Sequence, residues 1–150
     1  MEKHLKVNAI KDGTVIDHIP TNALFRVIRI LKLEESPNMV TFGNNLDSGL
    51  MGYKAIIKVA NRFFEDEEVN KIALVAPRAK LNTIRNYEVV EKRVVETPKM
   101  IRGIVRCFNP KCITHEENIL PKYEVISEKP LALKCFYCEK ITRENEMTFY

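Results

Sequence analysis

The feature that most limits how this chain can fold is the spacing of its four cysteines. They form a C-x4-C pair and a C-x2-C pair separated by 22 residues: Cys107, Cys112, Cys135 and Cys138. Two close pairs at this separation are typical of a tetrahedral thiolate site, because each pair supplies two ligands from one turn and the chain between them folds back. Four thiolates leave no coordination position open. The spacing therefore predicts one structural zinc ion that stabilises the C-terminal third of the chain.

Other uses of these thiols have less support. A cytoplasmic location is expected, because the start "MEKHLKVNAIKDG" lacks the apolar core of a signal peptide and no apolar run is long enough to span a membrane. That compartment keeps thiols reduced, which disfavours disulfides. A dithiol oxidoreductase stays as an alternative, although a redox C-x-x-C usually occurs without a second pair. His115 could replace a cysteine ligand, but four sulfurs already complete the site.

The distribution of charge limits the kinds of partner. The chain has 24 basic and 20 acidic residues and a formal net charge of +4. Residues 98–150, which contain the cysteines, have nine basic and seven acidic residues. So mild a positive charge argues against a surface that wraps nucleic acid. A nucleic-acid-binding zinc ribbon is nevertheless the main alternative, since Phe108, Phe136 and Tyr137 place aromatic rings close to the cysteines.

The cysteine-free first part alternates strand and helix patterns. Strands are expected at residues 4–10, 14–19, 38–43, 53–60, 73–77, 79–86 and 87–95, and helices at residues 21–33 and 64–72. Either Thr21 or Asn22 can cap the first helix, and residues 44–52 are rich in turn formers and are expected as a loop. The order strand, helix, strand, strand, helix, strand predicts a ferredoxin-like α/β sandwich, with an antiparallel sheet against two helices.

A domain boundary is expected near the segment "ETPKMIRG", which carries a proline and a glycine. It separates residues 1–97 from residues 98–150. The second part is too short to hold a stable core without help, and its strand patterns are short: residues 100–108, 122–128, 131–136 and 146–150. These features predict a small all-β domain held together by zinc, so the fold class of the whole chain is α+β.

The sequence lacks the motifs of common enzymes. It contains no G-x-S-x-G, no Walker-type phosphate loop, no H-E-x-x-H and no G-x-G-x-x-G, so a non-catalytic protein is expected. Binding has more support, because Lys58 and Lys92 lie near the ends of expected strands and Asp17 and His18 end another. Lysine suits phosphate groups. These residues indicate a site for an anionic small molecule, although exposed lysines and strand-end turns are also common without one.

Four blocks of the sequence resemble the regulatory chain of aspartate carbamoyltransferase. They are "GTVIDHIP" (13–20), "NLDSGLMGYK" (45–54), "APRAKLNTIRNYEVVEK" (76–92) and the cysteine pairs with "LKCFYCEK" (133–140), and the resemblance runs from about Leu5 to Phe149. It implies a non-catalytic subunit with an N-terminal nucleotide-binding allosteric domain and a C-terminal zinc domain that docks on a catalytic chain. In that family CTP, or CTP with UTP, inhibits and ATP activates the first committed step of pyrimidine synthesis, and Mg²⁺ can accompany the nucleotides.

The resemblance also implies the nucleotide-binding residues. Those expected at the base and ribose are Val7, Ala9, Ile10, Val15, Asp17, His18 and Lys58, with Ile84, Tyr87 and Val89 lining the pocket. Asn82 and Lys92, together with His18, would meet the phosphates. Family members often carry a lysine and an acidic residue where this chain has His4 and Asn8. These departures leave the strength and the sign of regulation open.

The resemblance further implies an assembly. The four cysteines correspond to the zinc ligands of the family, and the loop 108–111 with Tyr137 and Glu139 corresponds to its interface with the catalytic chain, with Asn109 and Lys111 as contacts from the loop. Regulatory chains would pair through their nucleotide domains, and three such dimers would hold two catalytic trimers in a dodecamer. No nucleic-acid or membrane partner is expected.

Overall fold

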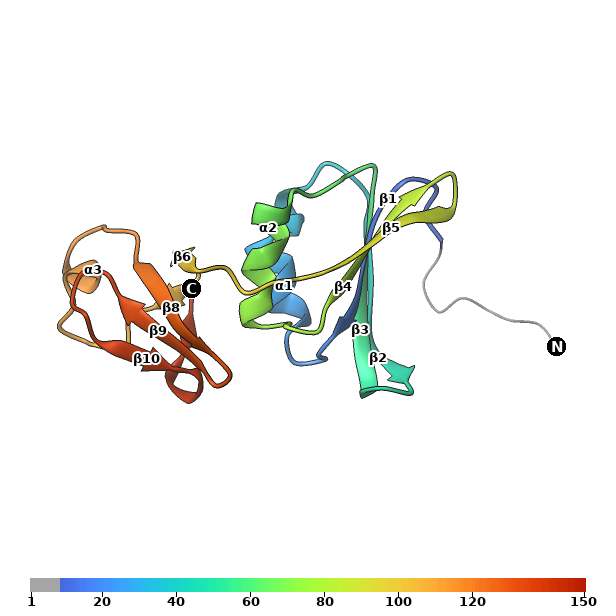
Figure 1. Ribbon diagram of the computed structural model, residues 1–150. Helices are drawn as coiled ribbons and strands as arrows, with labels where there is room; N and C mark the ends of the chain where they lie inside the picture. Colours follow the sequence, from blue (N-terminus) through green and yellow to red (C-terminus); the bar gives the residue numbers. More distant parts are fainter. Residues whose placement is uncertain (1–8) are drawn as a thin grey trace. The chain divides into compact units, whose positions relative to one another are not determined.

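The structure is a computed structural model that describes residues 9–150. The chain divides into two compact units, one ending at Glu96 and the other spanning Thr97–Tyr150, and each is described by itself (Figure 1). This division lies one residue before the boundary expected from the sequence. Among the described residues, no helix has the length and the apolar character needed to cross a membrane.

The first unit is built on a five-stranded antiparallel sheet. In spatial order its strands are β2 (Val40–Ser48), β3 (Gly52–Ala60), β1 (Gly13–Ile19), β4 (Lys80–Arg85) and β5 (Glu88–Val94). The helices are α1 (Leu24–Ile30) and α2 (Asp66–Asn70), followed by the 3-10 turns η1 (Leu33–Glu35) and η2 (Lys71–Leu74). The order β1-α1-β2-β3-α2-β4 confirms the ferredoxin-like sandwich, to which β5 adds an edge strand.

Strand β3 shows why the two faces of this sheet differ. Ala55, Ile57 and Val59 are fully buried, whereas Ile56 and Lys58 between them are only partly buried. Successive side chains of a strand point to opposite faces. The buried set packs in one cluster with apolar side chains of both helices. The opposite face, which neither α1 nor α2 covers (Figure 1), is therefore available for polar residues.

Helix α2 begins with a reciprocal pair of hydrogen bonds. The Glu65 side chain accepts from the backbone N–H of Glu68, and the Glu68 side chain accepts from the backbone N–H of Glu65. This capping box satisfies two backbone donors that a helix start leaves unpaired. The acidic residues at this end also suit the helix dipole. The carboxylates of Glu65 and Glu68 thus have a structural explanation.

The second unit consists of two small antiparallel sheets. A four-stranded sheet has the order β10 (Ile141–Arg143), β9 (Leu131–Cys135), β8 (Lys122–Glu128) and β6 (Met100–Arg102), and a two-stranded sheet pairs β11 (Thr148–Phe149) with β7 (Val105–Arg106). A single helical turn, α3 (Ile113–Glu116), and the 3-10 turn η3 (Glu144–Glu146) complete it. Tyr123 is fully buried and donates its hydroxyl to the Val105 carbonyl over 2.7 Å, which joins the two sheets.

The first helix differs from the sequence prediction at both ends. A helix over residues 21–33 with a polar side-chain cap was expected, but α1 begins after Ala23 and has no side-chain cap. A backbone hydrogen bond of 2.9 Å from the Ala23 N–H to the Pro20 carbonyl forms a turn in its place. Lys32 then adopts a left-handed conformation, with φ of 54°, and separates α1 from η1.

Two other predicted elements are also wrong. Residues 44–52 were expected as a loop, but β2 continues to Ser48, because the irregular register between Gly43 and Leu46 lets this polar edge strand keep pairing with β3. Residues 73–77 were expected as a strand, but they complete η2 and the turn after it, with Leu74 buried. A short apolar run cannot distinguish strand from helix by pattern alone.

The structure differs from the sequence prediction in three further places, one at the start of the described residues and two at short elements of the second unit. The strand expected at residues 4–10 lies mostly outside the described residues, and Ala9 and Ile10 are not in a strand. The short elements β10 and α3 were not predicted. Both lie next to cysteines and are too short for any periodicity to appear.

Gly13 is expected to be essential for the stability of the first unit. Its φ is +139°, and an added Cβ would lie 2.1 Å from the carbonyl oxygen of Val59 in β3. Gly13→Ala should therefore lower the free energy of unfolding by about 3 kcal/mol. Gly49→Ala is a matched control, because a Cβ there meets nothing within 4 Å. Denaturant titration of both variants checks this, and equal stability of the two would contradict it.

Candidate functional sites

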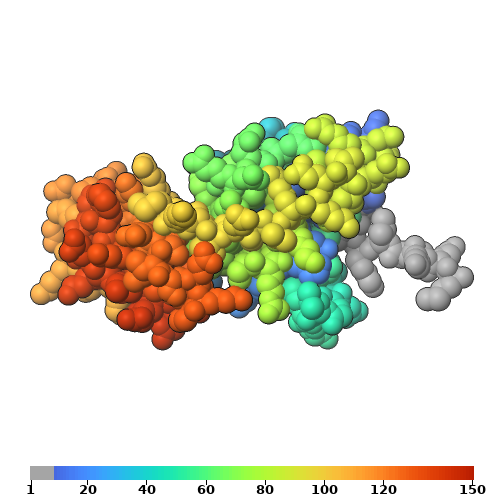
Figure 2. All heavy atoms as spheres, viewed as in Figure 1, coloured from blue at the N-terminus to red at the C-terminus, as the bar shows by residue number. Residues whose placement is uncertain are grey.

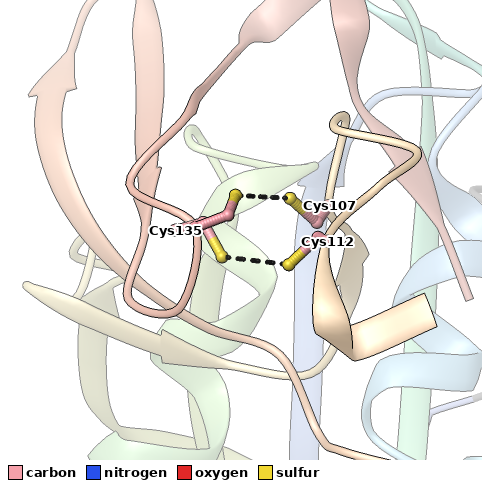
Figure 3. A group of neighbouring side chains, drawn as sticks. Cys107, Cys112 and Cys135 are labelled. Atoms are coloured by element: carbon pink, nitrogen blue, oxygen red, sulfur yellow. Dashed lines mark hydrogen bonds between the residues drawn. The ribbon is translucent and has the colours of Figure 1, made fainter. Parts of the chain in front are cut away.

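The second unit brings its four cysteine sulfurs together (Figure 3). The Sγ atoms of Cys107 and Cys138 are 3.6 Å apart, those of Cys112 and Cys135 are 3.8 Å apart, and all four lie within 4.8 Å of one another. Zinc–sulfur bonds of about 2.3 Å place the sulfurs of a tetrahedral site about 3.8 Å apart. A disulfide would require about 2.05 Å. The donor set therefore fits a tetrahedral metal ion held by all four cysteines.

Two tight backbone turns aim these sulfurs inward. In the first turn the Cys112 N–H donates to the Asn109 carbonyl over 3.0 Å. In the second, the Glu139 N–H donates to the Cys135 carbonyl over 3.0 Å, and Glu139 has a left-handed φ of 63°. Strand β9 delivers Cys135, and its partner strand β10 starts directly after the turn at Ile141. The local fold thus presents each cysteine pair from one turn.

Two neighbouring residues support the cysteines. The buried hydroxyl of Thr114 donates to the Cys112 sulfur over 3.2 Å. The Nε2 of His115 lies 2.8 Å from the carbonyl oxygen of Cys107. A ring nitrogen engaged with this carbonyl holds the first cysteine turn in place, so the structure gives His115 a supporting position beside the cysteines.

Burial changes the acidity of the thiols. It raises the pKa of Cys107 and of Cys135, although backbone N–H groups act in the opposite direction at both. At Cys138 burial also acts to raise the pKa, but hydrogen bonds from the Asn109 side chain, the Lys140 backbone and the Cys107 and Cys135 thiols together outweigh it, and the pKa falls to about 7. Since thiolates are the ligands, an incoming metal ion must displace protons.

Exposed aromatic and charged side chains surround the cysteine turns. Phe108, Phe136 and Tyr137 are 54%, 61% and 45% exposed, and the rings of Phe136 and Tyr137 form an edge-to-face pair. Lys111 and Glu139 are exposed beside them, whereas Asn109 is partly buried and accepts the Lys111 N–H at its side chain. The catalytic-chain contacts expected from the sequence thus lie on the two cysteine turns. Their role as contacts stays a prediction.

In the first unit, the pairing of strands aligns several expected nucleotide-binding residues. Val15 of β1 lies opposite Lys58 of β3 on one side and opposite Asn82 of β4 on the other. Asn82 lies in turn opposite Lys92 of β5. Directly opposed residues share a face of the sheet, and this face is the one that the helices do not cover. Lys58, Val15, Asn82 and Lys92 therefore form one row across four strands.

Apolar residues lie beside this row. Ile10, Val15 and Ile84 are less than 10% exposed and form a small cluster separate from the main core. Tyr87 and Val89 are exposed at the end of the sheet near Ile84. Burial lowers the pKa of Lys58, and the charge of Asp17 acts against that shift. The face thus combines an apolar patch with cationic groups.

An irregularity in β1 shapes one end of this face. The register of β1 shifts between Ile16 and Ile19, and His18 in this bulge adopts a left-handed φ of 59°. The His18 N–H donates to the Asp17 carboxylate over 2.6 Å. Among residues 9–150, the buried Nδ1 of His18 has no hydrogen-bond partner. Bulges re-aim side chains, commonly at functional sites, and the Nδ1 of His18 lies 3.7 Å from the Asp17 carboxylate.

The sequence argument missed Lys54. Its Nζ lies 2.9 Å from the Asp17 carboxylate, on the same face of β3 as Lys58. The signal that could have found it is the four-residue spacing of the two lysines along a strand. Of the other expected residues, Ala9 is exposed and Val7 lies outside the described part of the chain, as do His4 and Asn8. The nucleotide-binding roles stay predictions.

Together the two units define a class: a ferredoxin-like domain with a polar open sheet face, joined in sequence to a small domain with a tetrathiolate metal site. Comparison with sequence models of known families matches residues 5–96 to "Aspartate carbamoyltransferase regulatory chain, allosteric domain" and residues 99–148 to "Aspartate carbamoyltransferase regulatory chain, metal binding domain". These two matches cover nearly the whole chain and meet where the two units meet.

Individual relatives agree. The aspartate carbamoyltransferase regulatory chain of Phocaeicola vulgatus is 54% identical over 136 residues, which is 91% of this chain and 88% of that protein. The one from Pyrococcus furiosus is 53% identical over 145 residues, 95% of each chain. This chain belongs to the family of aspartate carbamoyltransferase regulatory chains. It is a non-catalytic, metal-binding subunit of an enzyme of pyrimidine biosynthesis, which confirms the resemblance and decides against the zinc-ribbon and oxidoreductase alternatives.

Removal of one cysteine should unfold the second unit alone. Cys112→Ala leaves a metal ion one ligand short, and a structural zinc site contributes on the order of 10 kcal/mol to folding. Bound metal should fall from about one ion per chain to nearly none, and residues 97–150 should become protease-sensitive while the first unit stays folded. Asn118→Ala is the control, because Asn118 is an exposed residue of the same unit outside the four-cysteine cluster, and it should keep its metal. Metal retained in Cys112→Ala at the level of the control would contradict a site that needs all four thiolates.

Metal uptake should release protons. The raised pKa values of Cys107 and Cys135 mean that both thiols are protonated at pH 7 in the metal-free chain. Binding of one metal ion should therefore release at least two protons at pH 7, and metal affinity should fall as the pH falls. Calorimetric zinc titrations in two buffers of different ionisation enthalpy measure this release. A release close to zero would contradict the tetrathiolate site.

Proposed function

We propose that this regulatory chain binds CTP, UTP and ATP on the open face of its sheet and transmits their effect to catalytic chains through its metal domain. CTP, alone or with UTP, is the inhibitor and ATP the activator, and Mg²⁺ accompanies the triphosphates. The proposal rests on the row formed by Lys58, Val15, Asn82 and Lys92 across β3, β1, β4 and β5. Family membership supports it.

The row supplies the chemistry that a nucleotide needs. The apolar cluster of Ile10, Val15 and Ile84 offers a surface for the base, and Asp17 can accept a hydrogen bond from an exocyclic amino group. Lys58 lies three strands from Lys92, a span of about 14 Å. The two lysines therefore meet different parts of an elongated ligand. Asn82 and Lys92, with His18, serve the phosphates.

The metal domain serves assembly in this proposal. The four thiolates would hold zinc, because four-cysteine tetrahedral sites are typical of structural zinc. Four thiolates would leave no coordination position open, so the ion would stabilise the two cysteine turns without performing chemistry. The turns then present Asn109, Lys111, Tyr137 and Glu139, with the rings of Phe108 and Phe136, to a catalytic chain. Exposed aromatic side chains around a rigid turn are suited to a protein interface.

Regulation requires that nucleotide affinity differ between two states of the assembly, because a ligand that binds both equally shifts nothing. Typical coupling free energies are about 1–3 kcal/mol. The assembly we propose is a cytoplasmic dodecamer, in which three regulatory dimers, each joined through its nucleotide domains, hold two catalytic trimers. Each regulatory chain carries a nucleotide site in its first unit and a catalytic-chain contact in its second unit, so the effect of the nucleotide passes along one polypeptide.

Lys92→Ala tests the proposed site. The variant should weaken CTP binding by about tenfold, because a hydrogen bond to a charged group contributes about 1.5–3 kcal/mol and 1.4 kcal/mol is a factor of ten. Arg78→Ala removes an equal charge from the exposed turn before β4 and should leave binding unchanged. Isothermal titration with CTP and gel filtration with catalytic trimer provide the two measurements. Titrations of Lys92→Ala that match the wild type would remove this residue from the site.

A further inference from the structure

A cavity of about 570 Å³ lies along the edge strand of the first unit and extends beyond the residues that the family resemblance implies. Strands β4 and β5 contribute Lys80, Asn82, Lys92 and Val94 to its lining. Figure 2 shows the segment around β5, in yellow-green, at the surface of the molecule. Asn82 and Lys92 already belong to the proposed phosphate site. Lys80 does not, and it is the residue that extends this site.

The register of β4 and β5 places Lys80 next to the proposed phosphate groups. Lys80 lies opposite Val94, and Asn82 lies opposite Lys92. Lys80 is therefore the diagonal neighbour of Lys92, and such neighbours are about 7–8 Å apart. Lys80 and Asn82 are two residues apart along β4, about 7 Å, and share a face. The three side chains form a triangle on the face of the sheet that the helices do not cover.

The two lysines of this triangle lack counter-charges. Within residues 9–150, neither the Lys80 nor the Lys92 side chain forms an ion pair or a hydrogen bond. Asp17, the cross-strand neighbour of Lys80 in β1, is ion-paired with Lys54 at 2.9 Å. Two ammonium groups at this separation repel each other, so an anion that meets both relieves the repulsion.

The carboxylates of the cavity do not cancel this charge. Asp66 is ion-paired with Arg93, whose cross-strand neighbour Leu81 is in the helix-facing core. That pair therefore lies toward the helices and away from the lysine face. Glu96 is the other carboxylate of the lining and lies beyond the end of β5. The part of the cavity on the open face is cationic.

We propose that Lys80 binds the terminal phosphates of the nucleotide and sets a preference for triphosphates over monophosphates. This inference rests on the proposed function. A monophosphate carries its charge next to the ribose and reaches only one apex of the triangle. A triphosphate extends further and meets both lysines. Lys80 thus determines specificity for the length of the phosphate chain, while the apolar cluster and Asp17 recognise the base.

The test compares CTP and CMP on the full-length chain. Lys80→Met should weaken CTP binding by on the order of fivefold and leave CMP binding within twofold of wild type, since one exposed ion pair is lost. Lys80→Arg, which keeps the charge, should retain most of the CTP affinity. Lys71→Met is the matched control, because Lys71 is an exposed lysine of the same unit outside the cavity lining. It should change neither affinity.

The outcomes separate this inference from the proposed function. Equal loss of CTP and CMP affinity in Lys80→Met, or no loss of either, would overturn the role of Lys80 and leave nucleotide binding intact. Failure of the wild-type chain to bind either nucleotide would overturn the proposed function and this inference with it. Circular dichroism melting of each variant confirms that the fold is retained.

Discussion

The second unit depends on one constraint, the meeting of four cysteine sulfurs at the centre of about 50 residues. Its sheets are short, and a unit of this size buries too little apolar surface to be stable on that basis alone. The cysteine turns supply what the core lacks. The second turn joins β9 to β10, which share three residue pairs, and the first follows β7, which shares two residue pairs with β11. The same turns display the exposed aromatic rings, so a metal ion there fixes both the fold and the surface proposed for docking.

In the first unit, the alternation of side chains along each strand gives the sheet one apolar face and one polar face. One set of residues on β3 and β4 packs against the helices, and the intervening set forms a face with lysines, an asparagine and a small apolar cluster. Because strand register fixes which side chains lie opposite one another, the row across β3, β1, β4 and β5 needs no loop closure. The proposed nucleotide would contact four strands at once, so its affinity would depend on how those strands are arranged.

The sequence predicted the features that repeat or are chemically distinctive. Cysteine spacing indicated the metal site, and the pattern of apolar and polar residues predicted β3 and β4. The sequence prediction failed where tertiary contacts decide. β2 extends through polar residues because β3 offers a pairing edge, and residues 73–77 form the end of η2 and a turn, in which Ala73 and Ala76 pack into the main core. Lys80 was missed because only the register of β4 with β5 shows that Lys92 is its neighbour.

The most direct test of the account is gel filtration of this chain mixed with catalytic trimer from the same source, with zinc bound and after a thiol-reactive mercurial has removed it. The account predicts a large complex when zinc is bound and separate chains when it is removed, with zinc content measured in each fraction. A complex of unchanged size after the metal is gone would contradict the claim that the cysteine site holds the docking surface in place.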